Sequence, residues 1–204
     1  MARYDREHKS QTRSRILSAA DRLIKQRGAE AATVAATMEA AGLTVGGFYA
    51  HFASKDDLAR ESLLFGLDES FRRLTAGLDG LDDRAWLRAL IRRYFAQLES
   101  GALDDACPLT LSLPEVARDD EAFRARFGAH AAMLVKSLQH RFPAVGGMAP
   151  AEVALSVFAA LAGAVALARA VARPHVRPRV VAATEKMLHA MLDLGPAPSA
   201  DDAA

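Results

Sequence analysis

The sequence of 204 residues has a formal net charge of +1, because its 26 Lys and Arg residues nearly balance its 25 Asp and Glu residues. Hydrophobic residues make up 51% of the chain, which is sufficient for a sizeable core and excludes a chain that is disordered throughout. The single cysteine, Cys107, excludes an internal disulfide and is typical of the reducing cytoplasm, so we expect a cytoplasmic location.

The N-terminal end of the chain is basic. Residues 1–27 contain eight Lys or Arg and three acidic residues, a local balance of 8 − 3 = +5. Residues 1–9 are compatible with a disordered leader or with a basic arm that follows DNA phosphates, and their charges are not typical of a signal peptide. The longest weakly polar run, Val153 to Ala168, has 16 residues and is expected to be too short to span a membrane.

Apolar residues recur at spacings of three and four along most of the chain, whereas no run alternates as a half-buried strand does. The pattern predicts an all-α fold of about nine helices. The first helix is expected from Ser10 to Arg27, ended by Gly28, and its polar face carries Arg13, Arg22 and Lys25. Later helices are expected within residues 33–52 and at 56–76, 83–100, 120–141, 151–172 and 178–194, with a loop and a short helix over 102–114.

The segment from Thr33 to Lys55 has the pattern of a helix-turn-helix. Thr33 can cap the first helix by accepting a hydrogen bond from a backbone N–H of the first turn. Gly42 is expected to end that helix in the left-handed conformation, which glycine adopts without steric cost. Thr44, two positions later, can cap a second helix over residues 45–52. Two short helices that meet at a sharp angle are typical of a unit that binds DNA.

The second short helix is expected to approach a surface closely. Gly46 and Gly47 each cost about 1 kcal/mol relative to Ala in a helix, and contact of the helix backbone with a DNA major groove can offset that cost. Two phenylalanines four residues apart are expected to face the core, so Tyr49 and His51 are the exposed rings. Lys55, at the start of the next helix, is placed where it can meet a phosphate.

The run AAGLTVGGFYAHFASKDDL follows a basic amphipathic helix and precedes a long all-helical region. In these features residues 10–65 resemble the tetracycline-repressor (TetR) family of transcriptional regulators, while the rest matches only in helical layout and length. The resemblance implies that the first three helices bind DNA, the fourth links them to an effector-binding core, and the last two form a homodimer. We expect a DNA-binding domain at 1–53, a ligand-binding and dimerisation domain at 54–194, and a disordered tail at 195–204.

By position, Thr44 and Tyr49 resemble the family's phosphate contacts, Lys55 resembles its basic contact to the DNA backbone, and His51 is similar to the His that precedes its Phe. Two alternatives stay open: His51 packs on its own neighbours, and Tyr49 fills space between helices. The candidate DNA-binding residues are Thr33, Thr44, Val45, Gly46, Gly47, Tyr49, His51 and Lys55.

The second helix lacks a long side chain that could bind guanine with two hydrogen bonds, because Val45 and Gly47 stand where some relatives have a long polar residue. Base discrimination is expected from methyl contacts by Thr44 and Val45, from Thr33 and Thr37, or from DNA shape and the N-terminal arm. The expected partner is a double-stranded, roughly palindromic operator.

The resemblance also implies a small-molecule effector, held by residues of the later helices. Ordinary core packing is the alternative for each aromatic side chain. The candidate ligand-binding residues are Trp86, Tyr94, Cys107, Phe123, Phe127 and His130.

Cys107 lies in the run ACPLTLSLPEVA, which resembles the electrophile-sensing branch of the family. The alternative is a small, buried apolar side chain. Because there is no second cysteine, sensing would require an adduct, a sulfenic acid or a bond between subunits.

The sequence therefore predicts a transcriptional repressor that a hydrophobic or electrophilic effector releases from DNA, with no cofactor, no metal ligand set and no membrane partner. Two other classes of protein, a thiol enzyme and a helical carrier, have less support in the sequence. A thiol enzyme that uses Cys107 with His130 or His140 has no supporting acid–base pattern, and no enzyme is expected. A carrier of lipids or acyl groups leaves the segment from Thr33 to Lys55 unexplained.

Overall fold

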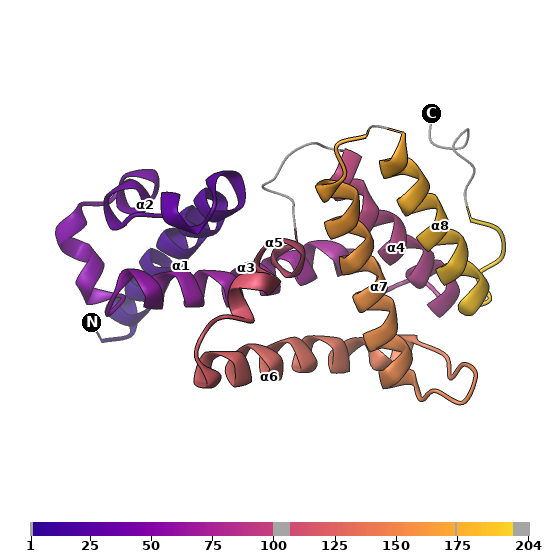
Figure 1. Cartoon of the computed structure of the whole chain (residues 1–204). Helices are drawn as coiled ribbons and strands as arrows, with labels where there is room; N and C mark the ends of the chain where they lie inside the picture. The colour runs from indigo at the N-terminus through magenta and orange to yellow at the C-terminus, as the bar shows by residue number, and fades with distance from the viewer. Residues whose placement is uncertain (1, 100–106, 174, 198–204) are drawn as a thin grey trace. The chain divides into compact units, whose positions relative to one another are not determined.

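The structure, a computed structural model, describes residues 2–99, 107–173 and 175–197. In this part of the chain the regular structure is helical, apart from one isolated β-bridge between Val145 and Met148 (Figure 1). The predicted all-α class is confirmed. The elements in chain order are α1 (Ala2–Arg27), η1 (Ala29–Ala31), α2 (Val34–Ala40), η2 (Val45–Ala50), α3 (Lys55–Thr75), α4 (Asp83–Glu99), α5 (Pro108–Val116), α6 (Glu121–Leu138), η4 (Gln139–Arg141), α7 (Pro150–Ala170) and α8 (Val176–Met191), where η denotes a 3-10 helix.

The largest difference from the predicted boundaries is at α1, which begins at Ala2 and not at Ser10. Residues 2–9 contain neither Gly nor Pro, so no residue there ends the helix, and of the two alternatives for this stretch the disordered leader is wrong. α5 also extends beyond its prediction, past Pro114 to Val116. Residues 102–106 of the predicted loop and residues 198–204 of the predicted tail lie outside the described residues.

The chain divides into two compact units. The first unit comprises Met1–Ser70 with Leu103–Arg124, and the second comprises Phe71–Ala102 with Ala125–Ala204. The divisions fall within α3 and within α6. The expected boundary between a domain at 1–53 and a domain at 54–194 stays a prediction.

The core of the first unit joins α1 to the helix-turn-helix. Thr33 caps α2 as predicted, since its Oγ1 accepts a hydrogen bond from the Ala36 N–H at 3.1 Å. The apolar residues behind this cap are fully or almost fully buried, which fixes α2 and η2 on α1. They are Ile16, Leu17, Ala19, Ala20, Met38, Ala41, Phe48, Phe52 and Leu58.

Gly42 forms the turn of the helix-turn-helix, with φ of 66° as predicted for a left-handed residue. The Gly42 N–H donates to the Glu39 carbonyl at 2.9 Å, and the Leu43 N–H donates to the Met38 carbonyl at 2.8 Å. This pair of bonds is the Schellman motif that ends many helices. Arg15 of α1 adds a third bond, from its Nη2 to the Ala41 carbonyl at 2.7 Å, so α1 also holds the turn.

The second helix of the motif differs from its prediction. It is a 3-10 helix, Val45–Ala50, and not an α-helix through Phe52. Thr44 occupies the capping position, but its side chain makes no capping hydrogen bond, so that part of the prediction is wrong. Two adjacent glycines weaken the α-helix, and a 3-10 turn is typical of such short connections.

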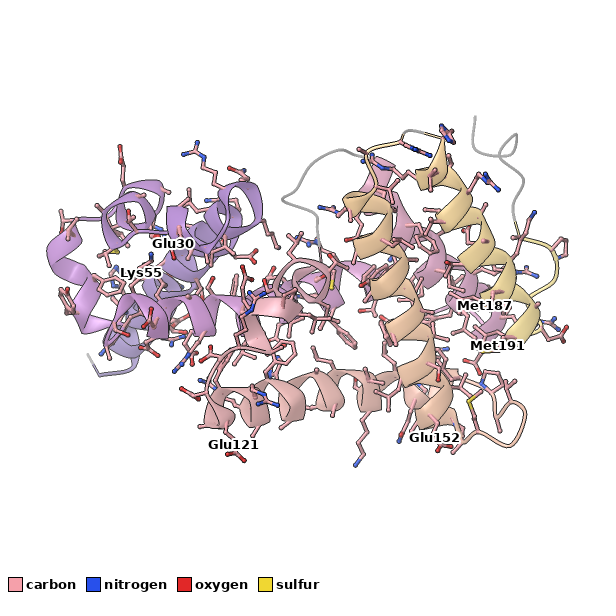
Figure 2. All side chains as sticks on the ribbon, viewed as in Figure 1. Glu30, Lys55, Glu121, Glu152, Met187 and Met191 are labelled. Carbon is pink, nitrogen blue, oxygen red and sulfur yellow. The ribbon has the colours of Figure 1, made fainter. Side chains whose placement is uncertain are left out.

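In the second unit, α4, α7 and α8 pack against one another (Figure 1). Trp86 of α4 is 2% exposed and packs edge-on against Phe142, with ring centroids 6.3 Å apart. α7 begins at Pro150, where Glu152 accepts a hydrogen bond from the Ala149 N–H at 2.7 Å (Figure 2). The buried face of α7 consists of Val153, Ala154, Val157, Leu161, Ala162, Ala164, Val165 and Ala168.

α7 is longer than the weakly polar run Val153 to Ala168 that lies within it. The helix has 21 residues and an 18-residue window with a mean hydropathy of 2.0, so by length and composition alone it could cross a membrane. The expectation that this run is too short is therefore wrong on length. Half of that window is buried within the structure, and the core helix of a protein without membrane spans meets the same criterion.

Replacing Gly42 with alanine is expected to lower the free energy of unfolding by about 1 kcal/mol, because an L-residue is strained at this positive φ. The added Cβ would also lie 3.4 Å from the Arg15 guanidinium. Urea denaturation measures the change. Gly46→Ala is the matched control, since Gly46 has an ordinary φ and no atom within 4 Å of a built Cβ. Equal unfolding midpoints for the two variants would contradict this account.

Candidate functional site

The candidate DNA-binding residues lie on and around η2, on the side of the motif that is not buried. Val45 is 50% exposed and Tyr49 is 73% exposed, both unusually high values for large apolar side chains. Thr33, Thr44 and Gly46 are also exposed, while Gly47, His51 and Lys55 are half-buried. The structure thus places the predicted residues at the surface, with an apolar patch between polar neighbours.

The Tyr49 ring is supported by a buried aromatic neighbour. Its ring packs edge-on against the buried Phe48 ring at 5.2 Å, with an interplanar angle of 87°. The exposure of Tyr49 argues against the alternative in which its ring fills space between helices. Next to it, the backbone of Gly46 has open space where a side chain would stand, so a partner surface can approach η2 closely there.

The surroundings of His51 favour its neutral form. Burial lowers its pKa below the ordinary value of 6.5, and the positive charges of Lys9 and Arg13 lower it further. Its Nδ1 is buried and has no hydrogen-bond partner among the residues that the structure describes. The ring lies near that of Phe52, with centroids 6.5 Å apart. His51 therefore packs on a neighbour, and its buried Nδ1 is not accessible to a partner molecule at the surface.

The start of α3 is ordered by reciprocal capping. The Asp57 N–H donates to Ser54 Oγ at 3.0 Å, and the Ala53 N–H donates to Asp57 Oδ2 at 2.9 Å, so Ser54 caps this helix. Lys55 follows directly, and its Nζ lies 3.4 Å from Glu30 Oε2 (Figure 2). Glu30 is fully exposed, and exposed ion pairs contribute only about 0–1 kcal/mol, so a phosphate can compete for Lys55.

Several cations of α1 have structural partners. Arg13 pairs with Glu61 at 3.2 Å and stacks over the Phe52 ring at 4.7 Å. Lys25, predicted on the exposed face, has a side chain only 2% exposed and pairs with Asp21 at 2.7 Å, so that prediction is wrong. The pairing of Asp21 with Lys25 at a spacing of four was the available signal in the sequence.

Sequence reasoning missed Glu30 and Arg15, which act on the predicted site directly. Glu30 competes for Lys55, and Arg15 bonds the carbonyl just before Gly42. Their partners are 25 and 26 residues away along the chain, so no local spacing indicates either contact.

The candidate ligand-binding residues are divided between the two units. Trp86, Tyr94, Phe127 and His130 belong to the second unit, while Cys107 and Phe123 belong to the first. Trp86 and Tyr94 are fully buried in the packed helices of their unit, which fits the alternative of core packing. Phe123 alone among the six lines a pocket in the first unit.

Cys107 directly precedes α5 and is 4% exposed. Its carbonyl accepts hydrogen bonds from the Thr110 N–H at 3.0 Å and from Thr110 Oγ1 at 2.7 Å, so its backbone is part of the helix start. A reagent in solution has little access to this thiol. Among the described residues no group of three or more His, Cys, Asp or Glu side chains is arranged to hold a metal ion.

Residues 16–61, which include the whole helix-turn-helix, match the sequence profile described as "Bacterial regulatory proteins, tetR family". Over these residues the chain matches the DNA-binding part of the TetR family. The uncharacterized HTH-type transcriptional regulator YfiR of Bacillus subtilis is 33% identical to this chain over 101 residues, 50% of this chain and 47% of that protein. The HTH-type transcriptional repressor KstR2 of Rhodococcus jostii is 36% identical over 99 residues, 47% of this chain and 48% of that protein. The chain spans about half the length of these curated relatives.

Solved structures of TetR-family regulators share the fold over most of the chain. A regulator from Cytophaga hutchinsonii superposes with a TM-score of 0.69 at 18% identity, covering 91% of this chain and 96% of that one. The reduced form of NemR from E. coli superposes with a TM-score of 0.65 at 19% identity, covering 86% and 95%. At these identities the likeness concerns the fold alone.

His51 should titrate below pH 6.5, and Lys9→Gln should raise its pKa toward that value by removing one nearby positive charge. NMR titration of the imidazole protons measures both. Arg22→Gln is the matched control, because it removes the same charge from an exposed position of the same helix. Equal shifts in the two variants would contradict a local effect.

The sign of the accompanying stability change follows from the lowered pKa. The folded state takes up the His51 proton less readily than the unfolded chain. The contribution of neutral His51 to the free energy of unfolding is therefore fully present above about pH 6.5. It decreases as the pH falls from 6.5 through the lowered pKa of the folded state.

Proposed function

We propose that the chain is a DNA-binding transcriptional regulator that places α2 and η2 on its operator. The observation that carries this proposal is the exposed surface of η2, where Val45, Gly46 and Tyr49 face solvent while Phe48 beneath them is fully buried. A helix-turn-helix that buries one face and presents the other is suited to the major groove. The family match covers the same residues.

In the proposed complex most of the named side chains bind the DNA backbone. Thr44 and Tyr49 donate hydrogen bonds to phosphates, Lys55 supplies a positive charge, and His51 is a further candidate contact by its place in the motif. Val45 is the candidate for contact with a thymine methyl group. Since none of these residues can bind guanine with two hydrogen bonds, we propose that DNA shape contributes to operator choice.

The effect on transcription is proposed to be repression, relieved by a small hydrophobic or electrophilic effector. KstR2, which is similar over half of its length, is described as a repressor. The alternative is thiol-based sensing at Cys107, which the burial of that side chain limits to reagents small enough to enter the fold. Both proposals, release by a small effector and thiol-based sensing, place the protein in the cytoplasm, because the operator DNA lies in that compartment.

We also propose a homodimer formed through the last two helices. Leu155 and Leu167 of α7 are 54% and 53% exposed, and Met187 of α8 is 50% exposed. Exposed apolar side chains on two helices that pack together are typical of an interface between subunits. A twofold dimer presents two copies of η2 to a palindromic operator, with half-sites about 34–36 Å apart or at a multiple of this distance.

Tyr49→Ala and Lys55→Ala are each expected to weaken operator binding about tenfold, through the loss of a phosphate contact in each subunit. Fluorescence anisotropy on DNA from upstream of the protein's own gene, or on a site selected from random DNA, measures the affinity. Lys55→Ala should also reduce the dependence of affinity on salt concentration. Glu30→Gln should strengthen binding up to about fivefold by releasing Lys55.

The matched control for Lys55→Ala is Lys136→Ala, which removes the same charge from an exposed position on α6. The proposal is wrong if operator affinity is unchanged in Tyr49→Ala and if Lys55→Ala and Lys136→Ala behave alike.

Met187→Arg is expected to convert the dimer to a monomer, because an unpaired positive charge would be buried in the interface. Sedimentation equilibrium distinguishes a chain of 21.9 kDa from its dimer. Met133→Arg provides the control, since Met133 is also apolar and 56% exposed but lies on α6. A dimer that survives Met187→Arg, or that Met133→Arg disrupts equally, would place the interface elsewhere.

A further inference from the structure

A small pocket lies within the first unit, where α1, α3 and α5 approach one another. Its volume is about 100 Å³. Its walls are mainly apolar, and none of the candidate DNA-binding residues lines it. The apolar side chains around it include Ile24, Leu63, Leu111 and Val116. Cavities of about this size bind single-ring molecules when their walls are apolar.

Ser62 gives the pocket a specific polar contact. The residue is 0% exposed, and its Oγ has no hydrogen-bond partner among the described residues. A buried hydroxyl without a partner is unfavourable, and most such groups in folded proteins have one. Because Ser62 lines the pocket, a hydroxyl or carbonyl group of a bound molecule can supply the missing partner.

Four charged residues of the lining, Asp21, Lys25, Arg60 and Asp119, already have charged partners within the protein. Lys25 pairs with Asp21 at 2.7 Å, and Arg60 of α3 pairs with both Asp119 and Asp120, the latter at 2.7 Å. The Arg60 guanidinium also lies 5.4 Å from the centre of the Phe123 ring. Two cations and three carboxylates, those of Asp21, Glu115 and Asp119, line the pocket, so an anionic molecule would be repelled.

We propose that this pocket binds a small neutral molecule with an apolar body and one hydroxyl or carbonyl group, which hydrogen-bonds to Ser62. The site is distinct from the candidate DNA-binding surface, and of the six candidate effector residues only Phe123 lines it. Its occupant lies in the same unit as the helix-turn-helix. The proposal does not depend on the proposed regulatory function, and its test uses no DNA.

The test is a titration of the full-length protein, labelled at Ile, Leu and Val methyl groups, with phenol, benzene and benzoate by NMR. Phenol should shift the methyl signals of Ile24, Leu63, Leu111 and Val116 and bind more tightly than benzene, while benzoate should not bind there. Ser62→Ala should weaken phenol binding about three- to tenfold and leave benzene binding unchanged, as expected for one lost hydrogen bond.

Ser70→Ala is the matched control, because Ser70 is also buried on α3 but does not line the pocket. Ala59→Leu, which fills the pocket from α3, should abolish the binding of both neutral molecules while the methyl signals of the second unit stay in place. The proposal is overturned if the methyl signals of these four residues do not respond to phenol. It is also overturned if Ser62→Ala and Ser70→Ala bind phenol equally well.

Discussion

Burial of Phe48 and Phe52 against α1 is the constraint on which the candidate DNA-binding surface depends. The two rings are 0% and 2% exposed and lie 5.7 Å apart, so they hold η2 on the core from one side. Residues between them in the chain, Tyr49 above all, must then point away from the core. The exposed surface of η2 is thus a consequence of its apolar anchors, and changes to the anchors would displace every contact residue together.

Hydrogen bonds and ion pairs stabilise the first unit in addition to its apolar core. They occupy many of the positively charged side chains of that unit. Arg15 bonds the carbonyl before Gly42, Arg13 pairs with Glu61, and Arg60 pairs with Asp119 and Asp120. Lys25, although counted among the basic residues of the N-terminal end, is buried in an ion pair. A count of basic residues therefore overstates the charge that this end of the chain offers to DNA.

The sequence was sufficient to predict the parts of the fold that depend on local chemistry. The Thr33 cap, the left-handed Gly42 and the inward-facing phenylalanines follow from side-chain type and spacing, and the structure contains all three. The 3-10 geometry of η2 was not predicted, because the small energy difference between two short helical forms is decided by packing. The Ser62 pocket and the Glu30–Lys55 pair join segments that are distant in the chain, and no residue pattern indicates them.

The pairing of Lys55 with Glu30 has a kinetic consequence for the proposed regulator. A carboxylate beside a phosphate-binding lysine weakens attachment to any DNA backbone, whatever its sequence. Non-operator DNA offers little beyond backbone contacts, so the protein leaves such sites sooner and samples more of the genome in a given time. Glu30, which is fully exposed and outside the helix-turn-helix itself, would in this way set the speed of the search for the operator.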